Sequence, residues 1–346
     1  MSSSPPAARA RAALQEIAIH LPEAELTNEQ LAAETGWTAE RILEQTGVRV
    51  RRIAAPGELA SDLGVLAAEK LFATAACRRE EVDFLLFCTQ SPDYLLPTTA
   101  CLVHARLGLR PDCGALDFNL GCSGFVYGLG LAKGLVESGA ARRVLLVTAE
   151  TYSKHIDPRD RSVRTIFGDG AAATLIGSVP GDEEALGPFV FGTDGRRAED
   201  IIVRAGALRM PLPAPSAAGA AGAAESWRTG RELQMNGPEV FNFSLRAVPA
   251  AVDRLLQAAG LRRAEVDYFV FHQASRFMLE HLRRKLDIPP EKFCFELEGC
   301  GNTVSSTIPI CLRAARDRGE LGAGARVMVV GFGVGYSWAA GLLRWS

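Results

Sequence analysis

Short apolar runs recur along the chain, and the clearest of them follow charged turns. Phe84–Phe87 comes after Cys77–Asp83, and Tyr268–Phe271 comes after Leu261–Asp267. A short apolar run that is bounded by polar turn residues is typical of a buried strand. The pattern therefore predicts a strand at each of these places.

These two strands belong to an internal repeat. When residues 77–91 are aligned with residues 261–275, seven of the fifteen positions are identical, among them an Arg-Arg pair and a Glu-Val-Asp run. Further along, Arg143–Val147 resembles Arg326–Val330, and both are continuous apolar runs of the kind found in strands that are buried on both faces. Chance similarity between buried strands is the alternative explanation of the repeat.

A third pair of similar segments extends the repeat. Asp117–Cys122 and Phe295–Cys300 are each predicted as a short strand that runs into a glycine turn. A repeat unit this long does not form a solenoid and instead predicts a duplicated α/β fold. Residues 1–180 form one predicted half and residues 181–346 the other, with the boundary in Ser178–Glu184, which is rich in Gly, Pro and acidic residues.

Helical periodicity lies between the predicted strands. Phe125–Ser138, Val248–Ala259 and Arg276–Leu286 carry apolar residues at helical spacing. Leu212–Gly222 is rich in Pro, Ala, Ser and Gly, which predicts a flexible loop on the surface. A mobile flap over an active site is the alternative interpretation of this loop.

Composition narrows the class of protein. The 346 residues are 48% hydrophobic and 23% charged, which is ordinary for a globular protein of two or three domains. The net charge of -2, from 38 basic and 40 acidic residues, offers no basic field for nucleic acid or for an anionic membrane. No apolar run approaches the roughly 20 residues of a membrane span. We therefore expect a protein that binds neither nucleic acid nor a membrane.

The termini and the cysteines indicate the compartment. Residues 1–14 lack the apolar stretch of a secretory signal, and we expect them to be a frayed lead-in. The eight cysteines do not resemble a disulfide framework, and they include no CxxC pair and no Cys/His spacing typical of zinc sites. The sequence thus predicts reduced thiols, a cytoplasmic location and no metal.

One cysteine lies where a nucleophile is expected. Cys122 stands between a predicted strand and the helix Phe125–Ser138, with glycines on both sides. Backbone N–H groups and the positive end of the dipole at a helix start stabilise a thiolate. The alternative is a small buried hydrophobic residue. Cys300 is a competing nucleophile candidate, although no equally clear helix start follows it.

Two polar residues also lie at strand ends. His272 follows the strand Tyr268–Phe271, and Asn302 lies at a later turn between a predicted strand and a helix. An asparagine amide donates a hydrogen bond to a carbonyl oxygen without being an acid. A structural histidine and an ordinary Gly-Asn turn are the alternatives. Because the strand ends of two related halves can converge, we expect both side chains to approach one site.

Five segments, in order along nearly the whole chain, closely resemble the 3-oxoacyl-(acyl-carrier-protein) synthase III family. They are Gly121–Gly128, Phe167–Ala171, His272–Ala274, Gly301–Thr303 and Gly331–Trp338. The resemblance implies an α/β thiolase fold in which duplicated halves form a layered αβαβα architecture. It also implies a cysteine-nucleophile condensing enzyme, an acyltransferase of fatty acid or polyketide-type biosynthesis.

The resemblance further implies a division of roles. Cys122 is the residue that becomes acylated, and His272 and Asn302 stabilise the enolate formed when a malonyl thioester loses carbon dioxide. The backbone N–H groups of Cys122 and Gly335 form the oxyanion hole. This ping-pong condensation needs no metal or redox cofactor, so no cofactor is predicted.

Several positions that bear on the substrate depart from common family members. Arg161 resembles an arginine near the nucleotide of the donor, and Phe241 resembles an aromatic residue of the entrance channel. Arg41 stands where members that prefer coenzyme A often have tryptophan. Ser275 replaces a frequent asparagine, and Phe277 replaces an arginine that assists docking of the carrier protein. A basic cluster is the substitute docking patch, with a solvated helix face as the alternative: Arg276, Arg283, Arg284 and Lys285.

The family also implies partners. We expect an acyl thioester, either acyl-CoA or acyl-ACP, together with malonyl-ACP, the acyl carrier protein itself and a second copy of the chain as a homodimer. In the family, the segment that matches Gln90–Pro97 reaches across the dimer and limits the acyl pocket. Members that use short primers often carry Phe where this chain has Leu96, which predicts a deeper pocket. The alternative is that Leu96 packs in the core and leaves the pocket short.

Three other functions stay open at this point. A relative of the same fold transfers its acyl group to oxygen or nitrogen without condensation. A non-catalytic partner subunit generally lacks the nucleophile, so Cys122 argues against that class. A hydrolytic cysteine enzyme would waste its acyl-enzyme. The sequence does not name the primer, the donor, the pathway or the final product.

Overall fold

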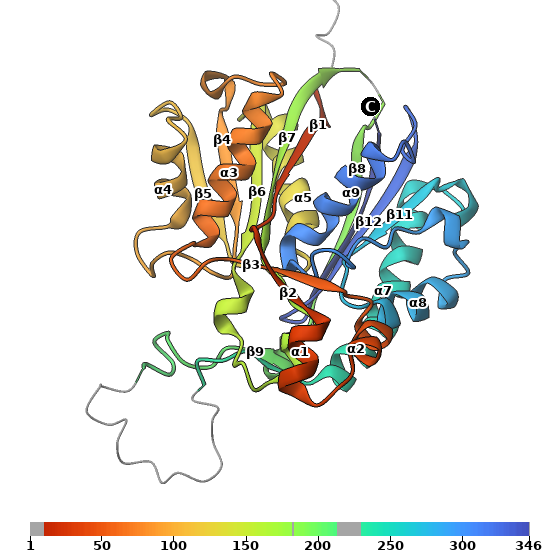
Figure 1. The fold of residues 1–346 in the computed structure, drawn as a ribbon. Coiled ribbons are helices and arrows are strands. Elements are labelled where there is room, and N and C mark those ends of the chain that lie inside the picture. Colours follow the sequence, from red (N-terminus) through yellow and green to blue (C-terminus); the bar gives the residue numbers. More distant parts are fainter. Residues whose placement is uncertain (1–9, 182, 213–229, 346) are drawn as a thin grey trace, which may run out of the picture.

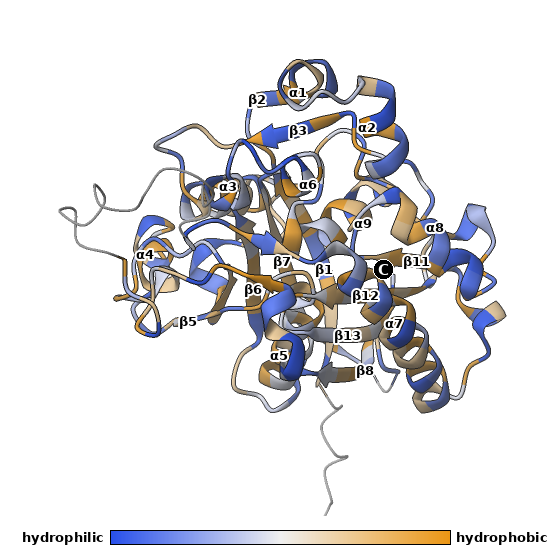
Figure 2. Cartoon of the chain, turned by 90° about the horizontal axis from the view of Figure 1, so that it is seen from below, coloured by the Kyte–Doolittle hydropathy of each residue, from blue (hydrophilic) through white to orange (hydrophobic). Residues whose placement is uncertain are grey.

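The computed structural model describes residues 10–181, 183–212 and 230–345. Two β-sheets lie beside each other, with helices between them and on both outer faces (Figure 1). Apolar residues concentrate on the strands and on the helix faces that cover them, while polar residues lie outward (Figure 2). The predicted loop Leu212–Gly222 lies, apart from Leu212, outside the described residues.

The first sheet has five strands in the order β1-β7-β6-β4-β5. These are β1 (Ala10–His20), β7 (Gly170–Pro180), β6 (Arg143–Glu150), β4 (Phe84–Cys88) and β5 (Gly114–Phe118). β7 is antiparallel to both of its neighbours, whereas β4 is parallel to β5 and β6. The strands predicted at Phe84 and Arg143 are thereby confirmed.

The second sheet has four strands in the order β11-β12-β13-β8. These are β11 (Tyr268–Phe271), β12 (Arg326–Gly333), β13 (Ser337–Arg344) and β8 (Leu186–Thr193). β11 is parallel to β12, as β4 is parallel to β6 in the first sheet. The strands predicted at Tyr268 and Arg326 are present. The division of the chain at residue 180 into two domains stays a prediction.

The repeated charged residues build the same turn in both halves. Glu81 and Glu265 each accept a hydrogen bond, 2.9 Å long, from the backbone N–H of the arginine three residues earlier. Asp83 and Asp267 each accept from backbone N–H groups at the start of the neighbouring strand, at 2.8 Å. The repeat therefore reflects a shared way of starting the central parallel strands.

Two helices form the layer between the sheets. α5 (Gly124–Glu137) and α9 (Thr307–Asp317) contact strands of both sheets. Phe125, Leu129 and other apolar residues of α5 are fully buried there. Gly128 allows this close packing, because a Cβ atom at that position would lie 2.6 Å from Leu146.

Other helices cover the outer faces. α3 (Ala60–Ala73) and α4 (Thr99–Arg106) contact the first sheet, and α7 (Gly237–Ala259) contacts the second, with α8 (Arg276–Lys285) packed against it. The result is five layers in the order αβαβα. This is the architecture that the resemblance implies, and the predicted fold class is confirmed.

The remaining elements lie at the end of the molecule that carries the site (Figure 1). β2 (Ala24–Thr27) pairs with β3 (Val50–Ile53), and two short helices lie between them in the sequence, α1 (Asn28–Thr35) and α2 (Ala39–Thr46).

Apart from turns of 3-10 helix, three further short elements lie in the described residues. α6 is a single helical turn, Arg161–Arg164, and β9 (Ile201–Ile202) pairs with β10 (Gln234–Met235). α6 leads directly into the wall of the cavity described below, and β10 leads into α7 through another part of that wall.

Three sequence predictions about local structure are wrong. Residues from Ala10 onward are not frayed, because they pair along β7. No strand forms at Phe295; instead Phe293 makes a single bridge to Phe269. The predicted helix Val248–Ala259 begins earlier, at Gly237, because Pro238 occupies the first turn, where a missing N–H is tolerated.

Candidate active site

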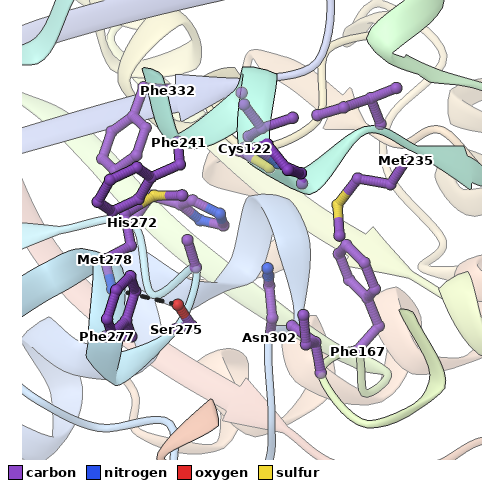
Figure 3. A pocket seen from close by; sticks show the side chains of 17 residues that line it. Cys122, Phe167, Met235, Phe241, His272, Ser275, Phe277, Met278, Asn302 and Phe332 are labelled. Atoms are coloured by element: carbon purple, nitrogen blue, oxygen red, sulfur yellow. Dashed lines mark hydrogen bonds between the residues drawn. The ribbon is translucent and has the colours of Figure 1, made fainter. Parts of the chain in front are cut away.

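A cavity of about 530 Å³ is lined by residues from distant parts of the chain, from Cys122 to Gly333. Its wall is mostly apolar, and Figure 3 shows the side chains around it. No Asp, Glu, Lys or Arg lines the cavity among the residues that the structure describes. The lining residues are Cys122, Ile166, Phe167, Ile201, Met235, Gly237, Pro238, Val240, Phe241, His272, Ala274, Ser275, Phe277, Met278, Asn302, Phe332 and Gly333.

Cys122 lies on the wall, two residues before the first residue of α5. The side chain is nearly buried, at 9% exposure. β12 passes directly over it, because a Cβ atom at Gly333 would lie 2.8 Å from Cys122 Sγ. A Cβ atom at Gly331 would lie 2.7 Å from the carbonyl oxygen of Cys122. Both glycines are therefore needed for this close approach of strand and cysteine.

Burial disfavours the thiolate form of Cys122. Burial, followed by the nearby Glu150 carboxyl, raises the pKa of Cys122 to about 12. A hydrogen bond from the backbone N–H of Val334 lowers this pKa, but not enough to offset burial. Burial therefore opposes the stabilisation of the thiolate that the helix start is expected to provide.

His272 follows β11 and faces the cavity (Figure 3). Its backbone N–H donates to the carbonyl of Val330 at 2.8 Å, and its Nδ1 lies 2.8 Å from Thr307 Oγ1. The edge of its ring meets Phe332, with ring centroids 5.6 Å apart. Burial lowers the pKa of His272 to about 3, so the imidazole is neutral at physiological pH.

Asn302 approaches the cavity from the opposite side. Its backbone forms a parallel bridge to Phe167, and its N–H donates to the carbonyl of Ile166 at 2.9 Å. Its side-chain Oδ1 accepts from the backbone N–H of Val304 at 2.9 Å. The amide nitrogen, Nδ2, is therefore the atom directed into the cavity (Figure 3).

An aromatic cluster surrounds the mouth of the cavity. Phe241 on α7 lies 5.4 Å from Phe277 on α8, measured between ring centroids, and His281 lies 4.3 Å from Phe277. Phe277 is 53% exposed, so the mouth is apolar as well as the interior. Ser275 also lines the cavity, where its hydroxyl caps α8 by accepting from the N–H of Met278 at 3.3 Å.

Three of the predicted site residues do not line the cavity. Leu96 is 86% exposed. Gly335 is absent from the described wall, and the backbone N–H that reaches the sulfur of Cys122 belongs to Val334, one residue earlier. Arg161 lies on α6, with its guanidinium 5.2 Å from the ring centroid of Trp37.

The indole of Trp37 contacts a second guanidinium. Arg41 approaches the same ring, 4.9 Å from its centroid. Trp37, Arg41 and Arg161 thus form a cation–π group, at the position where the sequence departs from common family members.

The competing nucleophile candidates lie elsewhere. Cys300 is buried outside the cavity wall, and burial raises its pKa to about 12. Cys88 is also buried and donates to the carbonyl of Leu120 at 2.9 Å. All eight cysteines are free. Among the cysteines of the residues that the structure describes, Cys122 alone lines the cavity.

Sequence reasoning missed a buried carboxyl beside the site. Glu150 ends β6 and accepts hydrogen bonds from the N–H of Gln90 and the hydroxyl of Ser305, both at 3.0 Å. Burial raises the pKa of Glu150 to about 8, so the carboxyl is largely protonated at neutral pH. The sequence did contain a signal for this residue, namely an acidic side chain at the end of an apolar strand.

Neither a metal site nor a membrane helix is found in the part of the chain that is described. That part contains no cluster of three or more His, Cys, Asp and Glu side chains able to hold a metal ion. Its helices are also too short or too polar to cross a membrane.

Comparison with known proteins gives a consistent result. The family model described as 3-oxoacyl-[acyl-carrier-protein (ACP)] synthase III matches residues 116–195, and its C-terminal counterpart matches residues 256–345. The β-ketoacyl-[acyl-carrier-protein] synthase III of Deinococcus deserti is 36% identical over 343 residues, which cover 99% of this chain and 94% of that protein.

Solved structures agree. A 2.1 Å crystal structure of a 3-oxoacyl-(acyl-carrier-protein) synthase III is 56% identical, with a TM-score of 0.93 over 97% of this chain and 100% of that one. A priming β-ketosynthase from a polyketide biosynthetic pathway is 29% identical, with a TM-score of 0.86 over 100% and 99% of the two chains.

Likeness of this extent places the molecule among the thiolase-fold condensing enzymes, which are transferases. Within that class, the chain belongs to the 3-oxoacyl-(acyl-carrier-protein) synthase III family. The recognition made from five sequence motifs is thereby confirmed.

Proposed function

We propose that the chain is an acyltransferase that condenses an acyl primer, held as a thioester on Cys122, with malonyl-ACP. Carbon dioxide is lost and a 3-oxoacyl thioester is formed, in fatty acid or polyketide-type biosynthesis. The observation that carries the proposal is the shared cavity: a buried thiol, a neutral imidazole and an amide N–H₂ face one apolar space next to a helix start.

In the first half-reaction, the sulfur of Cys122 attacks the carbonyl of an acyl thioester. The sulfur loses its proton, the leaving thiolate gains one, and a covalent acyl-enzyme remains. The backbone N–H groups of Cys122 and Val334 hold the tetrahedral oxyanion, with Val334 taking the place predicted for Gly335. The apolar wall excludes water, which protects the acyl-enzyme from hydrolysis.

In the second half-reaction, malonyl-ACP enters the same cavity. Its thioester carbonyl accepts hydrogen bonds from His272 Nε2–H and Asn302 Nδ2–H, which stabilise the enolate as the carboxylate leaves as carbon dioxide. A neutral histidine suits this role, because its ring donates one hydrogen bond while it carries no net charge. The enolate carbon attacks the acyl carbonyl on Cys122, and the sulfur leaves as a thiolate that takes up one proton from solvent.

The donor is acyl-CoA or acyl-ACP. Arg161, Arg41 and Trp37 provide guanidinium and indole surfaces that suit the nucleotide of coenzyme A. The basic end of α8 suits an acidic carrier protein. At this end Lys285 is exposed, whereas Arg283 and Arg284 already form ion pairs with Glu280. Phe241 and Ser275 contact the pantetheine arm at the mouth.

The working molecule is a cytoplasmic homodimer. Tyr94, Leu95 and Leu96 are 62%, 75% and 86% exposed in the isolated chain, and such a run of apolar side chains favours a covered surface. The helix that follows this segment, α4, is held to β5 by hydrogen bonds from the backbone N–H groups of Thr99 and Ala100 to Asp117, and β5 is the outermost strand of the first sheet. In the dimer, Leu96 reaches the acyl pocket of the partner subunit.

A decarboxylation assay tests the proposal. Malonyl-ACP labelled at its free carboxyl is mixed with the enzyme and an acyl thioester, and labelled carbon dioxide and the 3-oxoacyl product are measured. Both should form in equal amounts in the wild type, and the 3-oxoacyl product should be lost in Cys122→Ala and retained in the matched Cys300→Ala. Transfer of the acyl group to an oxygen or nitrogen nucleophile without labelled carbon dioxide would overturn it in favour of the non-condensing alternative.

A further inference from the structure

A short turn contacts the two proposed hydrogen-bond donors, Asn302 and His272, on the side that faces away from the cavity. The segment Val304–Ser306 is a turn of 3-10 helix, and Thr307 begins α9 directly after it. Val304 has φ of 56°, in the left-handed region that a β-branched residue rarely adopts. A strained residue that is buried beside a functional site is often kept for what its backbone contacts.

The backbone N–H of Val304 determines how Asn302 is used. It donates to Oδ1 of Asn302 at 2.9 Å, so the carbonyl end of the amide is occupied at the rear. The NH₂ end is left to face the cavity. The strained conformation of Val304 thus has a specific result: Asn302 presents donors, not an acceptor.

The hydroxyl of Thr307 stands in the same relation to His272. Thr307 Oγ1 lies 2.8 Å from His272 Nδ1 and 3.0 Å from the carbonyl oxygen of Val304. The hydroxyl has one proton for these two acceptors. The Val304 carbonyl already accepts from the backbone N–H of Thr307, so it does not depend on the hydroxyl.

We propose that Thr307 is a positioning residue that donates its hydroxyl proton to Nδ1 of His272 and thereby fixes the tautomer in which Nε2 carries the hydrogen. The inference rests on the proposed function, in which Nε2–H is one of the two donors to the malonyl thioester. Val304 and Thr307 together make both side chains donors toward the same carbonyl oxygen.

The opposite tautomer shows why the hydroxyl matters. With hydrogen on Nδ1, that atom donates toward Thr307 Oγ1 or the Val304 carbonyl, and the lone pair of Nε2 faces the cavity. A lone pair there repels the thioester oxygen as negative charge develops on it. A wrongly placed tautomer of a catalytic histidine lowers turnover by up to about 10⁴-fold in a well-studied hydrolase.

Thr307→Val tests the inference, because valine keeps the shape of threonine and removes the hydroxyl. Nδ1 is then left with the Val304 carbonyl as its partner, which favours hydrogen on Nδ1. Thr307→Ser restores the hydroxyl. Thr303→Val is the matched control: it is the same change at a buried threonine whose hydroxyl has no hydrogen-bond partner among the described residues.

The first readout is the tautomer itself. Nitrogen-15 NMR of histidine-labelled protein is practical because the chain has five histidines, and His272→Ala assigns the signal. In the wild type and in Thr307→Ser, Nδ1 should have the shift of an unprotonated nitrogen and Nε2 that of a protonated one. In Thr307→Val the two should exchange. This readout does not depend on whether the chain is a condensing enzyme.

The second readout separates the half-reactions. Thr307→Val should slow release of carbon dioxide by about 10²–10⁴-fold, while acylation of Cys122 stays within roughly threefold, and Thr307→Ser should recover most of the loss. Protonated Nδ1 in the wild type would overturn the inference, even if Thr307→Val fails to fold. So would an unchanged tautomer in Thr307→Val. If the tautomer is as proposed but the wild type releases no carbon dioxide, the proposed function fails instead.

Discussion

Replacing Glu150 by glutamine should change how stability depends on pH. Glu150 is fully buried at the end of β6, and its carboxyl accepts hydrogen bonds from the Gln90 N–H and the Ser305 hydroxyl. Glutamine is nearly isosteric and carries no titratable proton, so the variant keeps the packing and loses the titration.

The sign and size follow from the pKa. Burial raises the pKa of Glu150 from 4.5 to about 8, so between these pH values the folded chain holds a proton that the unfolded chain has released. The free energy of unfolding of the wild type therefore falls as the pH rises through this window. At about 1.4 kcal/mol per unit of pKa, the full window corresponds to roughly 5 kcal/mol, and the interval from pH 6 to pH 8 to roughly 2 kcal/mol.

Calorimetric melting at pH 6, 7 and 8 measures the effect. A change of 2 kcal/mol corresponds to a shift of about 3 °C for a chain of this length. The melting temperature of Glu150→Gln relative to wild type should rise by about that amount from pH 6 to pH 8. Glu44→Gln, at an exposed position on α2, is the matched control and should show no such trend. A difference between Glu150→Gln and wild type that is constant across this range would refute the reasoning.

Three further predictions concern the site and the assembly. His272→Ala and Asn302→Ala should each leave acylation of Cys122 largely intact and slow carbon dioxide release by roughly 10²–10³-fold, measured in separate half-reaction assays; equal losses in both would contradict the division of roles. Solution scattering at micromolar concentration should give the mass of a dimer, and a monomer mass would exclude the proposed assembly. Medium-chain or branched primers should load on Cys122, and Leu96→Phe should narrow the range; efficient loading of acetyl alone, unaffected by Leu96→Phe, would show that the pocket is short.

The strands of the fold were predictable because their signal is local. Tyr268–Phe271 and Phe84–Phe87 are apolar runs fixed by charged turns that recur in both halves, and β11 matches its predicted bounds. The strand expected at Phe295 did not form, since its similarity to the segment before Cys122 lies in the glycine turn rather than in strand pairing.

The candidate site was predictable only in part. Cys122, His272 and Asn302 were found because each stands at the end of an element beside a glycine or a chain reversal, and all three line one cavity. The backbone N–H that reaches the sulfur of Cys122 belongs to Val334, and this contact depends on how the chain after β12 bends over the sulfur, which sequence spacing does not determine. The oxyanion-hole role of Gly335 stays a prediction.

The contacts that support the candidate site are still harder to predict from the sequence. Thr307 meets His272 across 35 residues, and Glu150 meets Ser305 across 155. The predicted role of Leu96 cannot be judged from contacts within one chain. This residue is 86% exposed in the single chain, so its predicted role depends on a partner subunit. Long-range contacts of this kind are set by the packing of the two halves, not by local pattern.

The central claim is that Cys122 carries the acyl group. Incubating the full chain with an acyl thioester, followed by digestion and mass spectrometry of the peptides, locates the added mass directly. The account predicts a single acyl group on the peptide that contains Cys122, removed again when malonyl-ACP is supplied. An acyl group on Cys300 or Cys88, or a mass on Cys122 that malonyl-ACP does not remove, would contradict it.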